Sequence, residues 1–171
     1  QKAITSVEPV KARVYRPKEE ADAEKFQADW LGMKDTHDFF FLLHKHRLHR
    51  LDGLALAPAD HAIALDVSSL EHVLTGAAEN EVPIMVFVGS RGCIEIHTGP
   101  VHRILSAKGW LNVLDSGFNL HVDESRLAHC WLVRKPTVDG IVTSVEVYDE
   151  DGETICLLFG VRKPGQVENT R

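Results

Sequence analysis

A histidine at the start of an apolar helical pattern is the residue with the clearest capacity for chemistry. His37 lies in the segment DTHDFFFLL, where Asp35 can cap a helix and Asp38 completes a pattern like a capping box. The positions three, four and seven residues later share a helix face with it: Phe40, Phe41 and His44. A nitrogen ligand beside phenyl rings is what a flat aromatic metal macrocycle needs from a protein.

His37 also has an ordinary interpretation as a packed core residue. Histidine shows intermediate burial, and on an apolar helix face it is more often a satisfied core side chain than a ligand. We expect it in the first helical turn, where the helix dipole favours the neutral imidazole that binds metal. Asp35 and Asp38 favour the charged form instead, so the motif alone leaves both interpretations open.

A second group of histidines follows in the segment HKHRLH. His44, His46 and His49 could suggest zinc, but the neighbouring basic residues repel a cation and no glutamate accompanies a paired-histidine motif. We therefore expect a solvated basic helix end. The sequence contains neither a Gly-x-Ser-x-Gly elbow nor a phosphate-binding glycine loop, so it indicates no nucleophile and no nucleotide site.

The composition is that of one globular domain. The 171 residues can bury a sizeable core, and 44% hydrophobic with 26% charged residues is typical of a soluble protein. A net charge of -6 without a basic block argues against nucleic acid as a partner. No apolar run reaches the roughly 18 residues of a membrane span. Three cysteines without a Cys-x-x-Cys pair are typical of reduced thiols in a cytoplasmic protein.

The chain divides into a polar start and a patterned remainder. Residues 1–22 contain two prolines and a charged run, which is typical of an inter-domain linker. Residues 23–171 form the expected domain. Apolar periodicity predicts helices over 23–33, 37–47, 50–56 and 68–79, with a strand over 62–66.

From Pro83 onward the pattern changes to short strands separated by turns. The expected strands cover 84–88, 93–98, 101–105, 110–113, 118–122, 127–134, 141–148 and 154–162. Such a series predicts an α+β fold, with the N-terminal helices packed on a large antiparallel sheet. In the last strand, a bulge at Gly160 would change the side to which Arg162 points.

Five ordered segments resemble the bacterial haem-utilisation family of HemS, ChuS, ShuS and PhuS. They are WLGMKDTHDFF at 30–40, IMVFVGSRGCIEIHTG at 84–99, WLNV at 110–113, FNLHV at 118–122 and WLVRKPTVDG at 131–140. Members of this family consist of two similar halves, and the chain resembles the C-terminal half. The resemblance implies that 1–22 is the linker between the halves, that 23–171 is a haem-binding C-terminal domain and that a closing C-terminal helix is missing.

The resemblance also assigns roles to individual residues. His37 matches the proximal ligand of the iron in haem b. Arg50 and Lys135 match cations of the haem cleft, Phe87 matches a ring on the macrocycle, and Arg162 matches an arginine of the distal side. Arg50 and Lys135 are expected at a solvent-screened surface, so that each single replacement weakens ligand binding only modestly.

Two positions depart from the family pattern. Leu157 and Phe159 stand where the family has glutamine and tyrosine, although Phe159 is still expected to contact the cofactor. This loss of polar groups puts distal chemistry in doubt, but not ligation of the iron.

Three functions remain open from the sequence. The first is cytoplasmic haem binding and trafficking, with delivery to a haem oxygenase. The second is oxidative haem degradation by the domain itself. The third is a structural half-domain that dimerises and holds no ligand in isolation. Haem, a haem oxygenase, the N-terminal half and a second copy are the expected partners.

Overall fold

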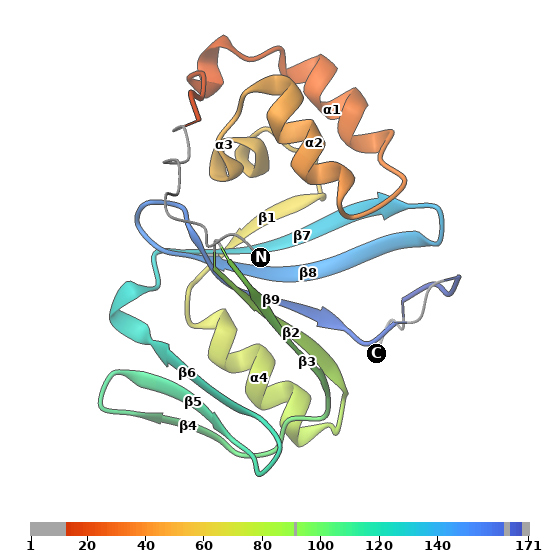
Figure 1. The fold of residues 1–171 in the computed structure, drawn as a ribbon. Coiled ribbons are helices and arrows are strands. Elements are labelled where there is room, and N and C mark those ends of the chain that lie inside the picture. The colour runs from red at the N-terminus through yellow and green to blue at the C-terminus, as the bar shows by residue number, and fades with distance from the viewer. Residues whose placement is uncertain (1–12, 91, 163–164, 169–171) are drawn as a thin grey trace, which may run out of the picture.

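A computed structural model describes residues 13–90, 92–162 and 165–168 and confirms the α+β fold (Figure 1). The helical elements are η1 (Lys18–Glu20), α1 (Ala23–Leu31), α2 (Asp38–His46), α3 (Arg50–Ala55), α4 (Ser69–Glu79) and η2 (Glu124–Arg126). The strands are β1 (Ala62–Leu65), β2 (Ile84–Gly89), β3 (Ile94–Gly99), β4 (Ile104–Ala107), β5 (Trp110–Leu114), β6 (Asn119–Asp123), β7 (His129–Thr137), β8 (Gly140–Tyr148) and β9 (Thr154–Gly160).

The described strands form two antiparallel sheets. The larger sheet has six strands in the order β1-β7-β8-β9-β2-β3, and the smaller sheet has three in the order β4-β5-β6. Hairpins account for the neighbours β7-β8-β9, β2-β3 and β4-β5-β6, as expected for short turns. The pairs β1-β7 and β2-β9 join segments that are distant in sequence, and they attach β1 and the β2-β3 hairpin to the β7-β8-β9 strands.

The two faces of the larger sheet carry different layers because side chains alternate along each strand. In β8, Val145 and Val147 pack with α4 and the small sheet, whereas Tyr148 packs with α1, α2 and α3. In β7, Cys130 belongs to the first of these cores and Val133 to the second. Figure 1 shows the three N-terminal helices at the β1 and β7 end of the sheet and α4 at the other side.

Aromatic side chains attach the N-terminal helices to the sheet. Asp22 caps α1 by accepting a hydrogen bond from the Lys25 backbone N–H at 3.0 Å. Phe26 and Trp30, four residues apart, are fully buried. Trp30 Nε1–H also donates to the carbonyl of Arg134 in β7 at 3.2 Å, so the buried indole has a polar partner.

The strand β4 begins three residues later than the sequence pattern indicates. The strand expected over 101–105 is β4, which begins at Ile104. The backbone N–H groups of His102 and Arg103 donate instead to the Asp115 carboxylate, at 3.0 and 2.9 Å. The Asp115 side chain thus accepts the backbone hydrogen bonds that a neighbouring strand would otherwise accept.

The expected bulge at Gly160 is wrong. β9 pairs with β2 in continuous register from Leu157 to Gly160, and Gly160 lies opposite Ile84. The irregularity in these strands lies between Val147 and Tyr148, at the other end of the β8-β9 ladder. The direction of Arg162 is therefore set by an unbulged strand end.

The expected linker is described only from Arg13. Residues 1–12 lie outside the described residues, and the remainder contacts the helical layer. The Arg16 backbone N–H donates to the carbonyl of Arg47 at 2.7 Å, and the ring of Tyr15 packs edge-on against His49 at 5.2 Å. The boundary at residue 22 stays a prediction. Among the helices that the structure describes, none is long and apolar enough to cross a membrane.

Candidate functional site

A cavity of about 470 Å³ lies between the start of α2 and the part of the large sheet that the N-terminal helices leave uncovered. The structure brings all six residues nominated from the sequence to this cavity: His37, Arg50, Phe87, Lys135, Phe159 and Arg162. Its remaining wall is formed mostly by apolar side chains: Phe39, Phe40, Met85, Ile94, Val142 and Leu157. Its volume falls in the range of roughly 300–1,000 Å³ that is usual for ligand sites.

Strand pairing explains why these apolar residues face the cavity together. Residues directly opposite in an antiparallel pair share a face. Met85 lies opposite Phe159, and Phe87 lies opposite Leu157. Phe87 and Phe159 are also in edge-to-face contact, with ring centroids 5.2 Å apart and an interplanar angle of 70°. The floor of the cavity is therefore a layer of side chains from β2 and β9.

His37 lies at the rim and its ring is exposed. It occupies the N-cap position of α2, which begins at Asp38, so the expected place in the first turn is wrong by one residue. The Nδ1 atom of His37 lies 2.6 Å from Oδ1 of Asp35, and the side chain is 88% exposed. Since Nδ1 is engaged, Nε2 is the nitrogen that remains for a metal.

The two aspartates beside His37 have different tasks. Asp38 Oδ2 accepts the backbone N–H groups of Lys34 and Asp35 at 2.8 and 3.0 Å, which matches the backward contact of a capping box. Asp35 Oδ1 accepts the backbone N–H of His37 at 2.8 Å as well as the ring contact. The His37 backbone N–H, followed by its ring, lowers the pKa of Asp35 from its ordinary value. Asp35 is therefore the hydrogen-bond partner of the His37 imidazole, whereas Asp38 bonds only to the backbone of the turn.

The expected helix face of four aromatic and histidine residues is only partly correct. Phe40 lines the cavity, but Phe41 does not and is 66% exposed. His44 lines a separate cavity of about 500 Å³ next to Arg47 and His49. Phe39, the residue before Phe40, is buried and lines the main cavity in place of Phe41. Phe39 packs on Trp30 of α1, with ring centroids 5.0 Å apart, and this contact turns Phe39 rather than Phe41 toward the protein.

The solvated basic helix end is also only partly correct. His46 is buried, and its Nε2 lies 2.7 Å from Oδ2 of Asp29 on α1. Its ring packs edge-on against Phe26 at 5.2 Å. Within the described residues, no group of three or more acidic, histidine or cysteine side chains could hold a metal ion.

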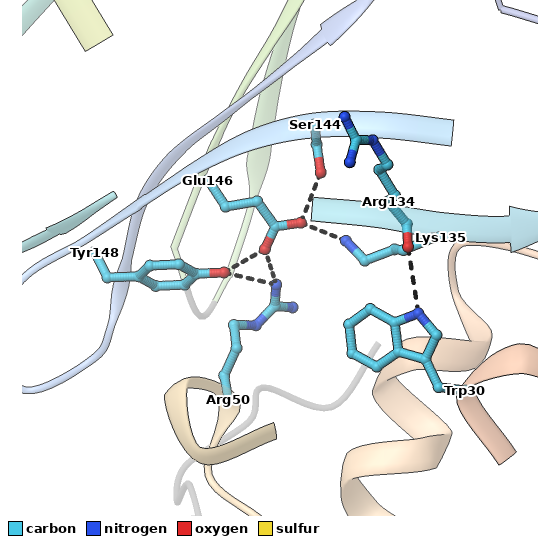
Figure 2. A network of polar contacts seen from close by, with 7 residues as sticks. All are labelled: Trp30, Arg50, Arg134, Lys135, Ser144, Glu146 and Tyr148. Carbon is cyan, nitrogen blue, oxygen red and sulfur yellow. Dashed lines mark hydrogen bonds and ion pairs between the residues drawn. The ribbon is translucent and has the colours of Figure 1, made fainter. Parts of the chain in front are cut away.

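A buried carboxylate joins two of the nominated cations (Figure 2). Glu146 of β8 is fully buried, and its Oε2 lies 3.0 Å from Nη1 of Arg50. Its Oε1 accepts from Nζ of Lys135, which is 5% exposed, and from Oγ of Ser144 at 2.9 Å. The Tyr148 hydroxyl donates to Oε2. Each carboxylate oxygen thus receives two donors, which fills its capacity as an acceptor.

Burial and pairing act in opposite directions on these groups. Burial raises the pKa of Glu146, but Lys135 and Arg50 outweigh it and hold the value at about 2. Burial lowers the pKa of Lys135, although the neighbouring carboxylate opposes that change. Burial and Glu146 raise the pKa of Tyr148, so its hydroxyl remains a donor. The network is therefore two cations and one anion, with a net charge of one positive unit.

The expectation of a solvent-screened surface is wrong for Lys135. The β7 strand turns Lys135 and Val133 toward the helices, where both are buried, and Phe39 lies beneath both cations. The Phe39 ring centroid is 5.0 Å from Nζ of Lys135 and 5.2 Å from Cζ of Arg50. A buried ion pair cannot be treated as a weak surface contact.

Sequence reasoning missed Glu146, Ser144 and Tyr148. The signal was available, since they alternate along the β8 pattern on the face that carries Val142. The sequence does not state that this face is covered, so Glu146 could equally have been an exposed strand residue.

Arg162 lines the cavity from beyond the end of β9. It follows the end of β9, its side chain is 24% exposed, and its Nη1 lies 3.8 Å from Oδ2 of Asp139. This distance is at the long end for an ion pair, so the contact holds Arg162 loosely.

The donors and walls of the cavity fit a planar, amphipathic metal ligand with acidic substituents. They offer one imidazole nitrogen at the rim, an apolar floor and cationic side chains in the lining. Haem needs the same three features: a nitrogen ligand, apolar contact with the ring and cations for its carboxylates.

Acidification is expected to destabilise the fold through Glu146. A carboxylate whose pKa is lower in the folded protein contributes stability that is complete above its ordinary pKa, 4.5, and is lost as the pH falls toward about 2. The free energy of unfolding, measured by urea titration, should therefore fall across this interval. The double variant Lys135→Met/Glu146→Gln should show a shallower fall, and an equal slope in both proteins would contradict this role.

Comparison with known proteins gives three findings. Residues 47–170 match the family model described as the haemin-degrading HemS/ChuX domain. This segment contains every nominated residue except His37, which precedes it. The chain is 40% identical over 151 residues to the hemin transport protein HemS of Yersinia enterocolitica. That alignment covers 88% of this chain and 44% of the relative, so the chain spans less than half the length of the curated protein.

Two solved structures share the fold at comparable identity. Holo-PhuS, a heme-binding protein from Pseudomonas aeruginosa, is 45% identical with a TM-score of 0.93, covering 98% of this chain and 48% of that one. The heme-degrading enzyme ChuS of Escherichia coli O157:H7 is 42% identical with a TM-score of 0.85, covering 88% and 45%. One of these relatives is named a heme-binding protein and the other a heme-degrading enzyme.

Proposed function

Because this chain belongs to the family of haemin-degrading HemS/ChuX domains, we propose that its cavity binds haem b and that His37 ligates the iron. The observation that supports this most directly is the position of His37. Its exposed ring stands at the rim of an apolar cavity, with Nδ1 engaged by Asp35 and Nε2 left for a metal. Metal-bound histidines usually have such a carboxylate partner on the second nitrogen.

The remaining cavity residues have complementary roles. Phe87 and Phe159 provide apolar contact for the macrocycle. Arg50 and Lys135 face the ligand carboxylates from α3 and β7. Arg162 lies on the side of β9, where it can orient a small molecule or a carboxylate through its guanidinium.

Carriage of haem is the function that these residues favour over its degradation. Bound haem supplies redox chemistry of iron, and its turnover requires hydrogen-bond donors near the open coordination position. Leu157 and Phe159 present only apolar groups to the cavity, and Arg162 is in contact with Asp139. We therefore propose a haem-trafficking domain in the cytoplasm that passes its cargo to a haem oxygenase.

The proposed C-terminal half would be completed by a further half of the protein. The cavity is open at the exposed side chains of Ile94 and Phe40, which are 58% and 47% exposed. A second half-domain or a second copy would cover this side of the ligand. A protein that contains both halves should therefore hold haem more tightly than residues 1–171.

Hemin titration followed in the Soret region tests binding, and incubation with ascorbate and catalase under air tests turnover. Carriage predicts a saturable Soret band that persists in the presence of the reductant. Catalase removes free peroxide, so loss of the band with a biliverdin-like product would identify an enzyme. The absence of any saturable band would favour a structural half-domain.

Asp35 offers a separate test of the proposed ligand. Asp35→Asn should weaken haem binding by roughly 10–100-fold, because the loss of an outer carboxylate partner reduces the basicity and alignment of a ligating imidazole. Asp38→Asn removes a neighbouring negative charge that contacts only backbone N–H groups of the turn. If both variants bind haem equally well, Asp35 has no role in ligation.

A further inference from the structure

The buried Glu146 is a titratable group that the proposed haem site does not use directly. It does not line the cavity, and its contacts to the cavity pass through Arg50 and Lys135. A buried carboxylate without charged partners would be strongly disfavoured, so these cations stabilise it in the free protein. In return, the same two side chains are already engaged before any ligand arrives (Figure 2).

We propose that Glu146 is an internal counter-ion that competes with the carboxylate of a bound porphyrin for Arg50 and Lys135. The inference rests on the proposed haem site and names a residue that sets its affinity. Two cations with one buried anion leave a single net positive charge, which corresponds to one ligand carboxylate. Glu146 thereby limits how strongly acidic substituents are held and favours release of the cargo.

The geometry supports competition rather than simple support of the fold. Arg50 contacts both Glu146 and Tyr148 through the same nitrogen, Nη1, at 3.0 and 3.4 Å. Its side chain is 27% exposed and lines both the main cavity and the adjoining one. A ligand carboxylate at Arg50 must therefore share the guanidinium with the negative charge behind it, and like charges at such short range repel.

The test compares iron-free protoporphyrin IX with its dimethyl ester, which lacks the two acid groups. Neither ligand needs His37, so failure of iron ligation by His37 would overturn the proposed function and leave this comparison intact. The ratio of the two dissociation constants, measured by fluorescence at about pH 6.5, isolates the contribution of the carboxylates. Arg50 stays charged at this pH whether or not Glu146 is present.

Glu146→Gln should raise the preference for the acid over the ester on the order of tenfold, although the variant should be less stable. A purely structural role would weaken both porphyrins alike and leave the ratio unchanged. The matched control is Glu168→Gln, which removes a half-buried carboxylate bonded to Thr143 on the other face of β8. Its ratio should equal that of the unchanged protein.

A second pair of variants keeps the test decisive where Glu146→Gln does not fold. Lys135→Met/Glu146→Gln and Lys135→Met differ only in the charge at residue 146. The double variant should show the higher acid-to-ester preference, again on the order of tenfold. An equal or lower preference in the variants without Glu146, or no binding of protoporphyrin IX to the unchanged protein, would overturn the inference.

Discussion

Replacing His37 with alanine should abolish native haem ligation and leave the fold intact. The loss of affinity should exceed the roughly 100-fold upper range for the loss of an outer-shell partner, because the ligand itself is removed. The imidazole is 88% exposed and bonded to Asp35, so its removal exposes no core. Hemin titration should show a displaced and weakened Soret band, while thermal unfolding of the ligand-free protein should be nearly unchanged.

His44→Ala is the matched control for this experiment. His44 lies on the same helix but lines the adjoining cavity, beside Arg47 and His49. Its loss should leave the Soret spectrum and affinity as they are in the unchanged protein. An unaltered spectrum in His37→Ala, or a lost band in His44→Ala, would show that another side chain holds the iron.

Lys135→Met should lower the free energy of unfolding by about 3–5 kcal/mol. The change keeps an unbranched apolar side chain, one atom shorter, but removes the ammonium that neutralises a fully buried Glu146. Arg50, Ser144 and Tyr148 remain as partners of the carboxylate, and they compensate only in part. Urea denaturation followed by circular dichroism gives this free energy directly.

Lys45→Met provides a comparison at an exposed ion pair. Nζ of Lys45 lies 2.7 Å from Oδ2 of Asp29, and the lysine side chain is 55% exposed. Its loss should cost only roughly 0–1 kcal/mol, because solvent screens the pair. Similar losses in the two variants would mean that Lys135 and Glu146 do not form a buried pair in solution.

The acid dependence has the same origin as the effect of Lys135. Protonation of Glu146 and removal of Lys135 each take away one partner of the buried pair. Replacing both partners with neutral groups of similar size avoids an uncompensated charge, so the double variant should be more stable than Lys135→Met alone. The acid titration and the unfolding free energies of Lys135→Met and of the double variant together separate the contribution of the Lys135–Glu146 pair to stability from the general effect of net charge.

Local sequence patterns were sufficient for most of the secondary structure. The apolar spacing over 23–33 predicts a helix with Phe26 and Trp30 on its inner face, and α1 buries both residues. Alternation in 141–148 predicts a strand with two different faces, and β8 has them. Both are properties of neighbouring residues, so the sequence alone could determine them. The fold class and the relation to the haem-utilisation family followed from the same patterns and motifs.

The polar organisation of the site was decided by the tertiary structure. Glu146 and Lys135 lie on the same face of the paired strands β8 and β7, and Arg50 reaches Glu146 from a helix far away in the sequence. Whether such groups are screened by water or buried depends on which layer covers that face of the sheet. The same reason explains His46, which belongs to a basic segment in the sequence but is buried against Phe26 and Asp29.

The sequence by itself determined the kind of chemistry available, namely one imidazole, aromatic rings and several cations near a helix start. Only the tertiary structure decided which side chains meet: Phe39 in place of Phe41, His44 in a separate cavity, and Glu146 between the two cations. Residue types and short spacings are set by the covalent chain, whereas burial and ion pairing depend on distances between segments that the fold alone brings together.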